Sequence, residues 1–118
     1  TFWEEFDPEK KPEEQYEMYG DPFGKSFCHA WAASPIYLLG RYFAGIQLTD
    51  TAYKTFTVKP EIETFEIMDC TFPVKGGLVH VQWDEKTLTV ESSVSGGTLI
   101  YGGKEYALEP GKLVQTTK

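Results

Sequence analysis

The sequence predicts a mainly β fold, an antiparallel β-sandwich preceded by short helices. After Leu48, apolar and polar residues alternate with a period of two, which is typical of strands that bury one face. Glycine-containing and acidic turns separate these runs at short intervals, as in consecutive β-hairpins. Only the segment Gly24–Leu48 has a long run of apolar residues at helical spacing, so the main helix is expected before the strands.

The first 23 residues are acidic and mostly irregular. They contain eight of the 18 acidic residues and only two of the 11 lysines and arginines. Proline and glycine interrupt them repeatedly, which leaves room for one short helix over residues 13–19. We interpret the charged run as a solvated surface.

The main helix is predicted to begin at Ser34-Pro35. A serine can cap the free N–H groups of a first turn, and a proline at the first helical position loses no hydrogen bond. Because Pro35 cannot lie inside one unbroken helix, residues 26–32 are expected to form a separate turn before it. Gly45 suits the left-handed residue that ends a helix. The apolar face is formed by Ile36, Leu39 and Phe43, with Leu38 and Tyr42 alongside.

About six to eight short strands are predicted from Phe56 to the end of the chain. A change of phase near Met68-Asp69 indicates a bulge or a strand break. Residues 84–86 form a turn between two alternating runs, and Gly102-Gly103 is a two-residue turn that requires positive φ. The alternating positions are Phe56, Val58, Phe65, Ile67, Cys70, Phe72, Val74, Val79, Val81, Trp83, Leu88, Val90, Ser92 and Val94.

Composition excludes several classes of function. The net charge is −7 and no basic stripe is present, so nucleic-acid binding is not expected. No run approaches the roughly 18 apolar residues of a membrane-spanning helix, and no signal-peptide pattern stands at the start. Cys28 and Cys70 lack metal-ligand spacing and are predicted to be buried free thiols, with one disulfide as the alternative. His80 lies inside an alternating run without a second histidine at ligand spacing, so no metal or cofactor is expected.

The chain is expected to be part of a larger protein. It begins without an initiator methionine, and residues 1–48 carry more aromatic side chains than so short a segment can bury. The break in organisation is expected between Leu48 and Tyr53. Periplasmic, extracellular and cytoplasmic locations are all compatible with the sequence. The aromatic residues concerned are Phe2, Trp3, Phe6, Phe27, Trp31, Tyr37, Tyr42 and Phe43.

Two adjacent carboxylates, Glu4 and Glu5, lie among the aromatic residues Phe2, Trp3 and Phe6. An apolar, partly dry setting raises the pKa of a carboxyl group and makes acid–base chemistry near neutral pH accessible. The alternative interpretation places Trp3 in a core and Glu4 on a surface.

His29 and Trp31 lie at the predicted entrance of the helix, where side chains can point into a cleft. His29 is a candidate site residue there, and the alternative is a hydrogen-bonded histidine of the core. Trp31 is open to two interpretations, stacking on a sugar or packing alone.

Several segments carry a family resemblance. They are Thr1-Phe2-Trp3-Glu4 and SFCHAWAASP at Ser26–Pro35, continued by Tyr37-Leu38-Leu39, Arg41-Tyr42 and Gly45-Ile46. These segments resemble the C-terminal end of bacterial α-L-rhamnosidases of glycoside hydrolase family 78. In that family a T-x-W-E segment and a C-H-containing helix close an (α/α)6 barrel, and a β-sandwich follows directly. The resemblance covers nearly the whole chain. It implies that residues 1–50 are the end of a catalytic barrel and residues 51–118 a C-terminal β-sandwich domain.

The resemblance also implies hydrolysis of terminal α-L-rhamnosyl bonds with inversion of configuration. Two carboxyl groups about 6.5–9.5 Å apart carry out such a reaction, one protonating the leaving oxygen and one activating water. By resemblance, Glu4 is the general base, His29 binds sugar hydroxyls and Trp3 walls the rhamnose pocket. The general acid of the family lies upstream. The implied partners are therefore the remainder of the barrel and a rhamnose-containing glycan, and the isolated chain is expected to be inactive.

Three features depart from the family pattern or blur it. Phe2 stands where an aliphatic residue is common, and Ala32-Ala33 replaces a serine-containing pair. Glu5 beside Glu4 leaves the assignment of the base open by one residue.

Two other hypotheses remain open. The chain could be a non-catalytic β-sandwich module that binds carbohydrate or packs on a neighbouring domain, with Trp83, Tyr101 and Tyr106 as a stacking face. The strand phase of Trp83 favours a core position instead. The parent protein could also be a related (α/α)6 hydrolase that acts on another deoxy sugar or a hexose.

Overall fold

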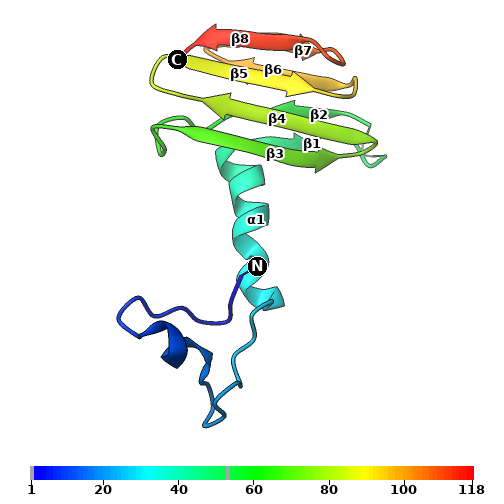
Figure 1. The fold of residues 1–118 in the computed structure, drawn as a ribbon. Coiled ribbons are helices and arrows are strands. Elements are labelled where there is room, and N and C mark those ends of the chain that lie inside the picture. Colours follow the sequence, from blue (N-terminus) through cyan, green and yellow to red (C-terminus); the bar gives the residue numbers. More distant parts are fainter. Residues whose placement is uncertain (1, 53) are drawn as a thin grey trace. The chain divides into compact units, whose positions relative to one another are not determined.

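The computed structural model describes residues 2–52 and 54–118, and the chain divides into two compact units (Figure 1). Thr1, the first residue of the T-x-W-E segment, lies outside the described residues, as does Tyr53 at the predicted break in organisation. None of the helices in the described ranges is long and apolar enough to cross a membrane.

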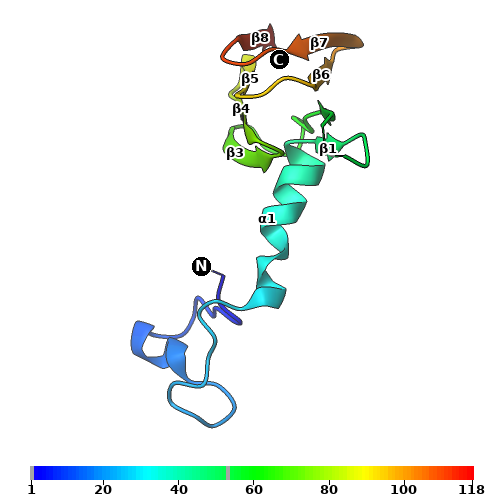
Figure 2. The same ribbon diagram turned by 90° about the vertical axis from the view of Figure 1, so that its right-hand side faces the viewer.

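The unit Leu38–Lys118 is a β-sandwich of two four-stranded sheets, which confirms the predicted fold class. Figure 2 shows the two sheets edge-on. One sheet has the order β1-β2-β6-β7, with bounds Ile46–Leu48, Phe56–Val58, Gly97–Tyr101 and Lys104–Leu108. The other has the order β3-β4-β5-β8, with bounds Met68–Val74, Gly77–Trp83, Thr87–Ser92 and Leu113–Thr117.

Pairing between the described strands is antiparallel with one exception, since β2 runs parallel to β6 and Phe56 lies opposite Gly97. A parallel pair needs a long connection between its strands, and here that connection contains β3, β4 and β5 of the other sheet. β1 pairs with β2 in the same sheet. The division into a barrel end at residues 1–50 and a sandwich domain at residues 51–118 stays a prediction.

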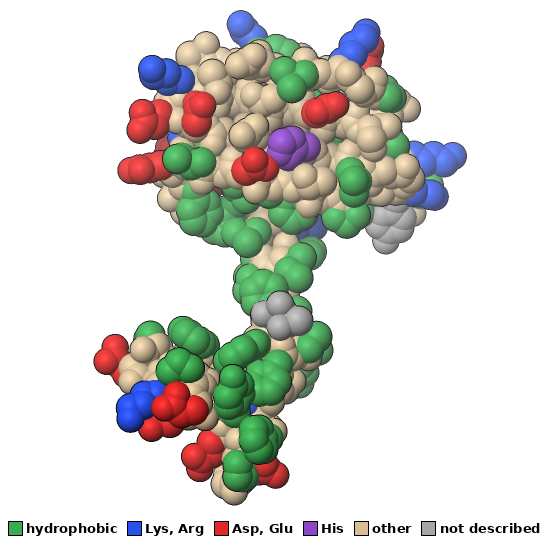
Figure 3. All heavy atoms as spheres, in the orientation of Figure 1, with side chains coloured by type: hydrophobic (Ala, Val, Ile, Leu, Met, Phe, Trp, Pro, Cys, Tyr) green, Lys and Arg blue, Asp and Glu red, His purple; other side chains and the backbone are tan. Residues whose placement is uncertain are grey.

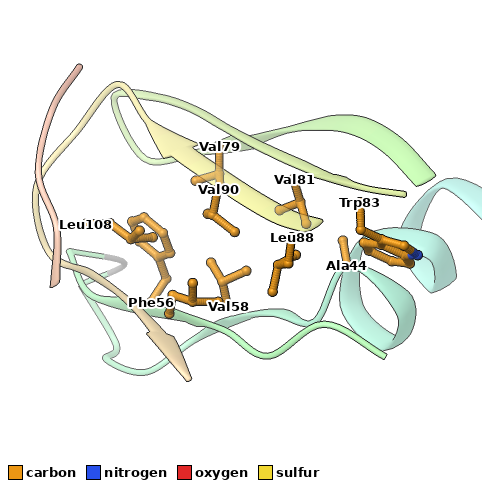
Figure 4. Close-up of a cluster of buried hydrophobic side chains, with 10 residues drawn as sticks. Ala44, Phe56, Val58, Val79, Val81, Trp83, Leu88, Val90 and Leu108 are labelled. Atoms are coloured by element: carbon orange, nitrogen blue, oxygen red, sulfur yellow. The ribbon is translucent and has the colours of Figure 1, made fainter. Parts of the chain in front are cut away.

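The core lies between the two sheets and is built mainly by β4 and β5 (Figure 4). Alternation with a period of two points every second residue of each strand inward. The inward residues Val79, Val81, Trp83, Leu88, Val90 and Ser92 are all buried, as the predicted phase requires. Each fully buried aliphatic side chain of this kind contributes about 1.5–3 kcal/mol.

Trp83 anchors one end of this core beside Ala44 (Figure 4). Its side chain is 1% exposed, and its indole N–H donates a hydrogen bond of 2.9 Å to the carbonyl of Phe65. The predicted core position of Trp83 is therefore confirmed. The hypothesis of a sugar-stacking face that includes Trp83 is wrong, because the buried ring has no free surface on which a sugar could stack.

The helical segment differs from the prediction at its start. A 3-10 turn, Ala30–Ala33, leads directly into α1, Ser34–Leu38, and a π-helical turn follows at Leu39–Phe43. Ser34 itself has helical angles, φ −51° and ψ −32°, so it is not the extended residue that caps a helix. The predicted separate turn is thus only the short Ala30–Ala33 turn. In the acidic segment, the predicted helix is likewise shorter, a 3-10 turn at Pro12–Tyr16.

Gly45 ends the helical segment with φ 71°, as predicted. Its carbonyl accepts a hydrogen bond of 3.0 Å from the Lys59 N–H, and a Cβ at this position would overlap the Lys59 carbonyl. Gly111 has nearly the same angle, φ 70°, yet a Cβ there meets no described atom within 4 Å. The two glycines therefore share a backbone conformation and differ in the space around them.

We expect Gly45→Ala to destabilise the sandwich clearly more than Gly111→Ala. Both substitutions lose about 1–2 kcal/mol because alanine disfavours left-handed angles. Only Gly45→Ala also pushes a methyl group into the backbone of Lys59. Urea unfolding of the two variants measures the difference. Equal midpoints would show that the backbone near Gly45 can move away from the added methyl group without a loss of stability.

The unit Thr1–Tyr37 is held by a cluster of aromatic rings. Ring centroids within this aromatic cluster lie 4.9–6.4 Å apart, in edge-on or tilted arrangements. Its members are Trp3, Phe6, Tyr16, Phe23 and Phe27. Much apolar surface stays exposed on this part of the chain, as the green side chains in Figure 3 show. Trp31 is 90% exposed, so the interpretation of Trp31 as a packing residue is wrong for the described chain.

The two cysteines are free, as predicted, but they differ in burial. Cys28 is exposed, so its predicted burial is wrong. Cys70 is partly buried in β3, and its Sγ donates to the carbonyl of Val81 at 3.4 Å. Burial, and to a lesser degree the charge of Asp69, raises the pKa of the Cys70 thiol to about 11. A thiol with this pKa is almost wholly protonated at neutral pH, which makes Cys70 a poor nucleophile.

Candidate active site

Backbone pairing within the first unit brings the opening segment next to residues 26–29. The Glu4 N–H donates to the carbonyl of Ser26 at 2.9 Å, and the His29 N–H donates to the carbonyl of Phe2 at 2.9 Å. These two bonds hold the segments side by side. They place the Glu4 side chain next to Ser26 and His29, which are more than 20 residues away in the sequence.

The Glu4 carboxylate lies at the centre of a small polar network. Its Oε1 accepts a hydrogen bond of 2.8 Å from the Tyr19 hydroxyl, and its Oε2 accepts one of 3.3 Å from the Ser26 N–H. The Nδ1 atom of His29 lies 3.9 Å from Oε2. The Glu4 side chain is 17% exposed, so one part of it remains open to solvent or to a ligand. The structure thus brings together two of the predicted site residues, Glu4 and His29.

These contacts lower the pKa of the Glu4 carboxyl below its ordinary value. The hydrogen bond from Tyr19 is the largest cause, followed by the bond from the Ser26 backbone, and the charges of His29 and Lys25 add to them. Desolvation opposes the shift without reversing it. The predicted rise of the pKa is therefore wrong for Glu4. Hydrogen bonds to the ionised form outweigh the apolar neighbours, and the side chain is a carboxylate at neutral pH.

Glu5 has different surroundings, although it is adjacent to Glu4 in the sequence. Its Oε2 lies 3.8 Å from the Nζ of Lys25, and the Glu5 side chain is 47% exposed. The Lys25 side chain is fully buried, and among the described residues its Nζ has no hydrogen-bond partner. Glu5 therefore serves as the nearest counter-charge of a buried ammonium group, whereas Glu4 lies in the hydrogen-bonded network.

Trp3 belongs to the aromatic cluster and is only partly exposed. Its ring meets that of Phe27 edge-on, with centroids 4.9 Å apart and an interplanar angle of 62°. Phe6 and Tyr16 lie slightly farther from it, at 6.3 and 6.4 Å. The cluster fixes the orientation of the indole one residue before Glu4.

Two residues of the site were missed by sequence reasoning, Tyr19 and Lys25. Tyr19 reaches Glu4 because it sits in a tight turn with Gly20, closed by reciprocal backbone bonds between Met18 and Asp21. Gly20 is a turn signal in the sequence, but it says nothing of the direction in which the tyrosine points. The burial of Lys25 has no sequence signal, since lysine is among the residues most often exposed.

The described residues offer no alternative site built around a metal. Within residues 2–52 and 54–118, no group of three or more His, Cys, Asp or Glu side chains is arranged to hold a metal ion. His80 pairs with Asp69 alone, at 2.8 Å, on the exposed face of β3 and β4.

Comparison with known proteins gives a likeness of fold. No protein-family model matches the chain, and no curated protein sequence matches it. One similar solved structure is described as "Putative kojibiose phosphorylase from human microbiome". It superimposes with a TM-score of 0.53 at 14% sequence identity, over 77% of this chain and 12% of that chain. Most of this chain therefore shares its fold with a small part of a much longer protein.

Proposed function

We propose that the chain is the C-terminal part of an inverting glycoside hydrolase, an α-L-rhamnosidase, in which Glu4 is the general base. The observation that carries this proposal is the Glu4 carboxylate itself, held ionised by Tyr19 and Ser26 beside His29. Two further findings support it. The segments around Glu4 and His29 resemble family 78, and the fold recurs in a protein named for its action on a disaccharide.

The geometry suits the task of a base better than that of an acid. An ionised carboxylate can only accept hydrogen bonds, and each oxygen keeps an acceptor site beyond the one used by Tyr19 or Ser26. A water bound there can give its proton to Glu4 as it attacks the anomeric carbon. A general acid about 6.5–9.5 Å away, on another part of the protein, would protonate the leaving oxygen.

His29 and Trp3 have roles that follow from their positions. The His29 ring lies 3.9 Å from the base and is partly exposed, so it can hydrogen-bond to a sugar hydroxyl next to the reacting carbon. Trp3 offers a partly exposed aromatic ring held in place by Phe27, and the apolar faces of sugars pack on aromatic rings. The exposed aromatic side chains elsewhere in residues 2–37 would be covered by the preceding helices of the barrel.

A phosphorylase is the second candidate, and the name of the similar structure favours it. In such an enzyme inorganic phosphate replaces water as the nucleophile and needs no general base. Phosphate is an anion at neutral pH, and the ionised Glu4 would repel it at close range. The charge of Glu4 therefore supports water as the nucleophile.

The test uses the full-length protein that carries this chain and a panel of aryl α-glycosides, with and without phosphate. We expect free rhamnose in both buffers, and proton NMR should show that the β-anomer forms first. Sugar 1-phosphate that appears only with phosphate would establish the phosphorylase instead. Cleavage of another glycoside in the panel would reassign the sugar. The isolated 118-residue chain should show no turnover above background, because the family resemblance places the general acid upstream of this chain.

A further inference from the structure

Tyr19 has a backbone conformation that tyrosine rarely adopts. Its φ is 55°, and the other positive φ angles among the described residues all belong to glycines. Left-handed angles cost a residue with a Cβ about 1–2 kcal/mol. Tyr19 and Gly20 (φ 80°) form the two central positions of a turn that prefers Asn-Gly. The turn alone would therefore be better served by another residue.

Packing does not explain the choice of tyrosine either. The Tyr19 side chain is 84% exposed, so its ring gains little from burial. The contact that the structure describes for it is the hydrogen bond from its hydroxyl to Glu4 Oε1, at 2.8 Å. Hydrogen bonds in exposed positions add little to stability. A strained backbone and an exposed ring therefore serve mainly to bring one hydroxyl to one carboxylate, and such strain is typical of functional sites.

We propose that Tyr19 is a positioning residue for Glu4 and that the Tyr19 hydroxyl, bound to Oε1, fixes the rotation of the carboxylate. This inference rests on the proposed role of Glu4 as a base. With Tyr19 on Oε1 and the Ser26 N–H on Oε2, both oxygens are anchored and the carboxylate plane cannot turn freely. The free acceptor sites then keep a constant direction toward an attacking water.

The charged groups around this pair act in the same sense. His29 and Lys25 stabilise the ionised form of Glu4, and the negative charge of Glu5 favours the protonated form of Tyr19. The hydrogen bond that Tyr19 donates to Glu4, together with the negative charge of Glu4, raises the pKa of Tyr19 above its ordinary value, so the hydroxyl keeps its proton throughout the neutral range. Tyr19 therefore stays a donor and Glu4 an acceptor over the whole neutral range, and the hydrogen bond between them persists.

Removal of the hydroxyl should raise the pKa of Glu4 back toward its ordinary value, because a hydrogen bond that favours the ionised form is lost. The acid limb of the kcat/KM profile follows the ionisation of the base in the free enzyme. In the full-length protein, Tyr19→Phe should therefore move this limb to higher pH. Plateau kcat should fall, but less than in Glu4→Gln, and KM should change little. Tyr106→Phe, which removes a hydroxyl from β7 of the sandwich, is the matched control and should leave the profile unchanged.

A second variant separates positioning from a structural role. Tyr19→Asn places Asn-Gly in the turn, so the unfolding midpoint should stay equal or rise while the acid limb moves as in Tyr19→Phe. A lower midpoint with an unmoved acid limb would show that Tyr19 is structural and overturn the inference. The inference is also overturned if Glu4→Gln is inactive while Tyr19→Phe keeps the native pH profile. The proposed role of Glu4 as the base would survive that result. If Glu4→Gln is fully active, the proposed function itself fails, and the inference falls with it.

Discussion

Glu4→Gln in the full-length protein is expected to lower kcat by roughly 10²–10⁴-fold, the usual contribution of general acid–base catalysis. The amide has nearly the same shape as the carboxylate, and its oxygen can still accept the hydrogen bond from Tyr19. It cannot take a proton from water at neutral pH. Because only the reacting step loses an interaction, KM should change little. Steady-state kinetics with the best aryl glycoside, and circular dichroism for the fold, measure both parts.

Two further variants control this experiment. Glu5→Gln tests the adjacent carboxylate, and a small effect on kcat is expected because Glu5 faces Lys25 and not the Glu4 network. Glu13→Gln removes an exposed acid from the first turn of the Pro12–Tyr16 helix and should change nothing. A large loss in Glu5→Gln with an active Glu4→Gln would move the base by one residue. Full activity in both would contradict the hydrolase.

The sandwich was predictable because its signal is local. In β4 and β5, side chains such as Val81 and Val90 alternate with polar residues, and burial of one face demands that alternation. Gly45 was predictable for a similar reason, since only glycine adopts its φ without strain. The parallel pairing of β2 with β6 was not, because the period of a strand fixes which face is buried but names neither its partner nor its direction.

The candidate site was predictable only in part, for physical reasons. Glu4 and His29 were both candidates from their sequence surroundings, the family resemblance gave them their roles, and they lie together. The predicted direction of the pKa shift of Glu4 was wrong because the sequence neighbours Phe2 and Trp3 do not supply the dominant contact. That contact comes from Tyr19, fifteen residues away, and depends on one backbone angle of a turn. Hydrogen bonds between distant segments leave no periodic trace in a sequence.

Trp83→Ala is expected to destabilise the sandwich by about 3–5 kcal/mol, the usual loss for a large aromatic residue of a core. The ring is 1% exposed beside Ala44 (Figure 4), and its removal leaves a cavity between the two sheets. The carbonyl of Phe65 also loses its donor. Urea unfolding of the 118-residue chain, followed by far-UV circular dichroism, measures the change.

Two other substitutions serve as comparisons for Trp83→Ala: one keeps most of the ring volume at position 83, and one removes an exposed tryptophan. Trp83→Phe keeps most of the apolar volume but removes the indole N–H and part of the second ring, so it should cost at least the roughly 1–3 kcal/mol of a carbonyl left without a partner and less than Trp83→Ala. Trp31→Ala removes a tryptophan that is 90% exposed and should shift stability by no more than about 0.5 kcal/mol. If Trp83→Ala were no more harmful than Trp31→Ala, the indole would not be a core residue. The packing of the two sheets around it would then need another explanation.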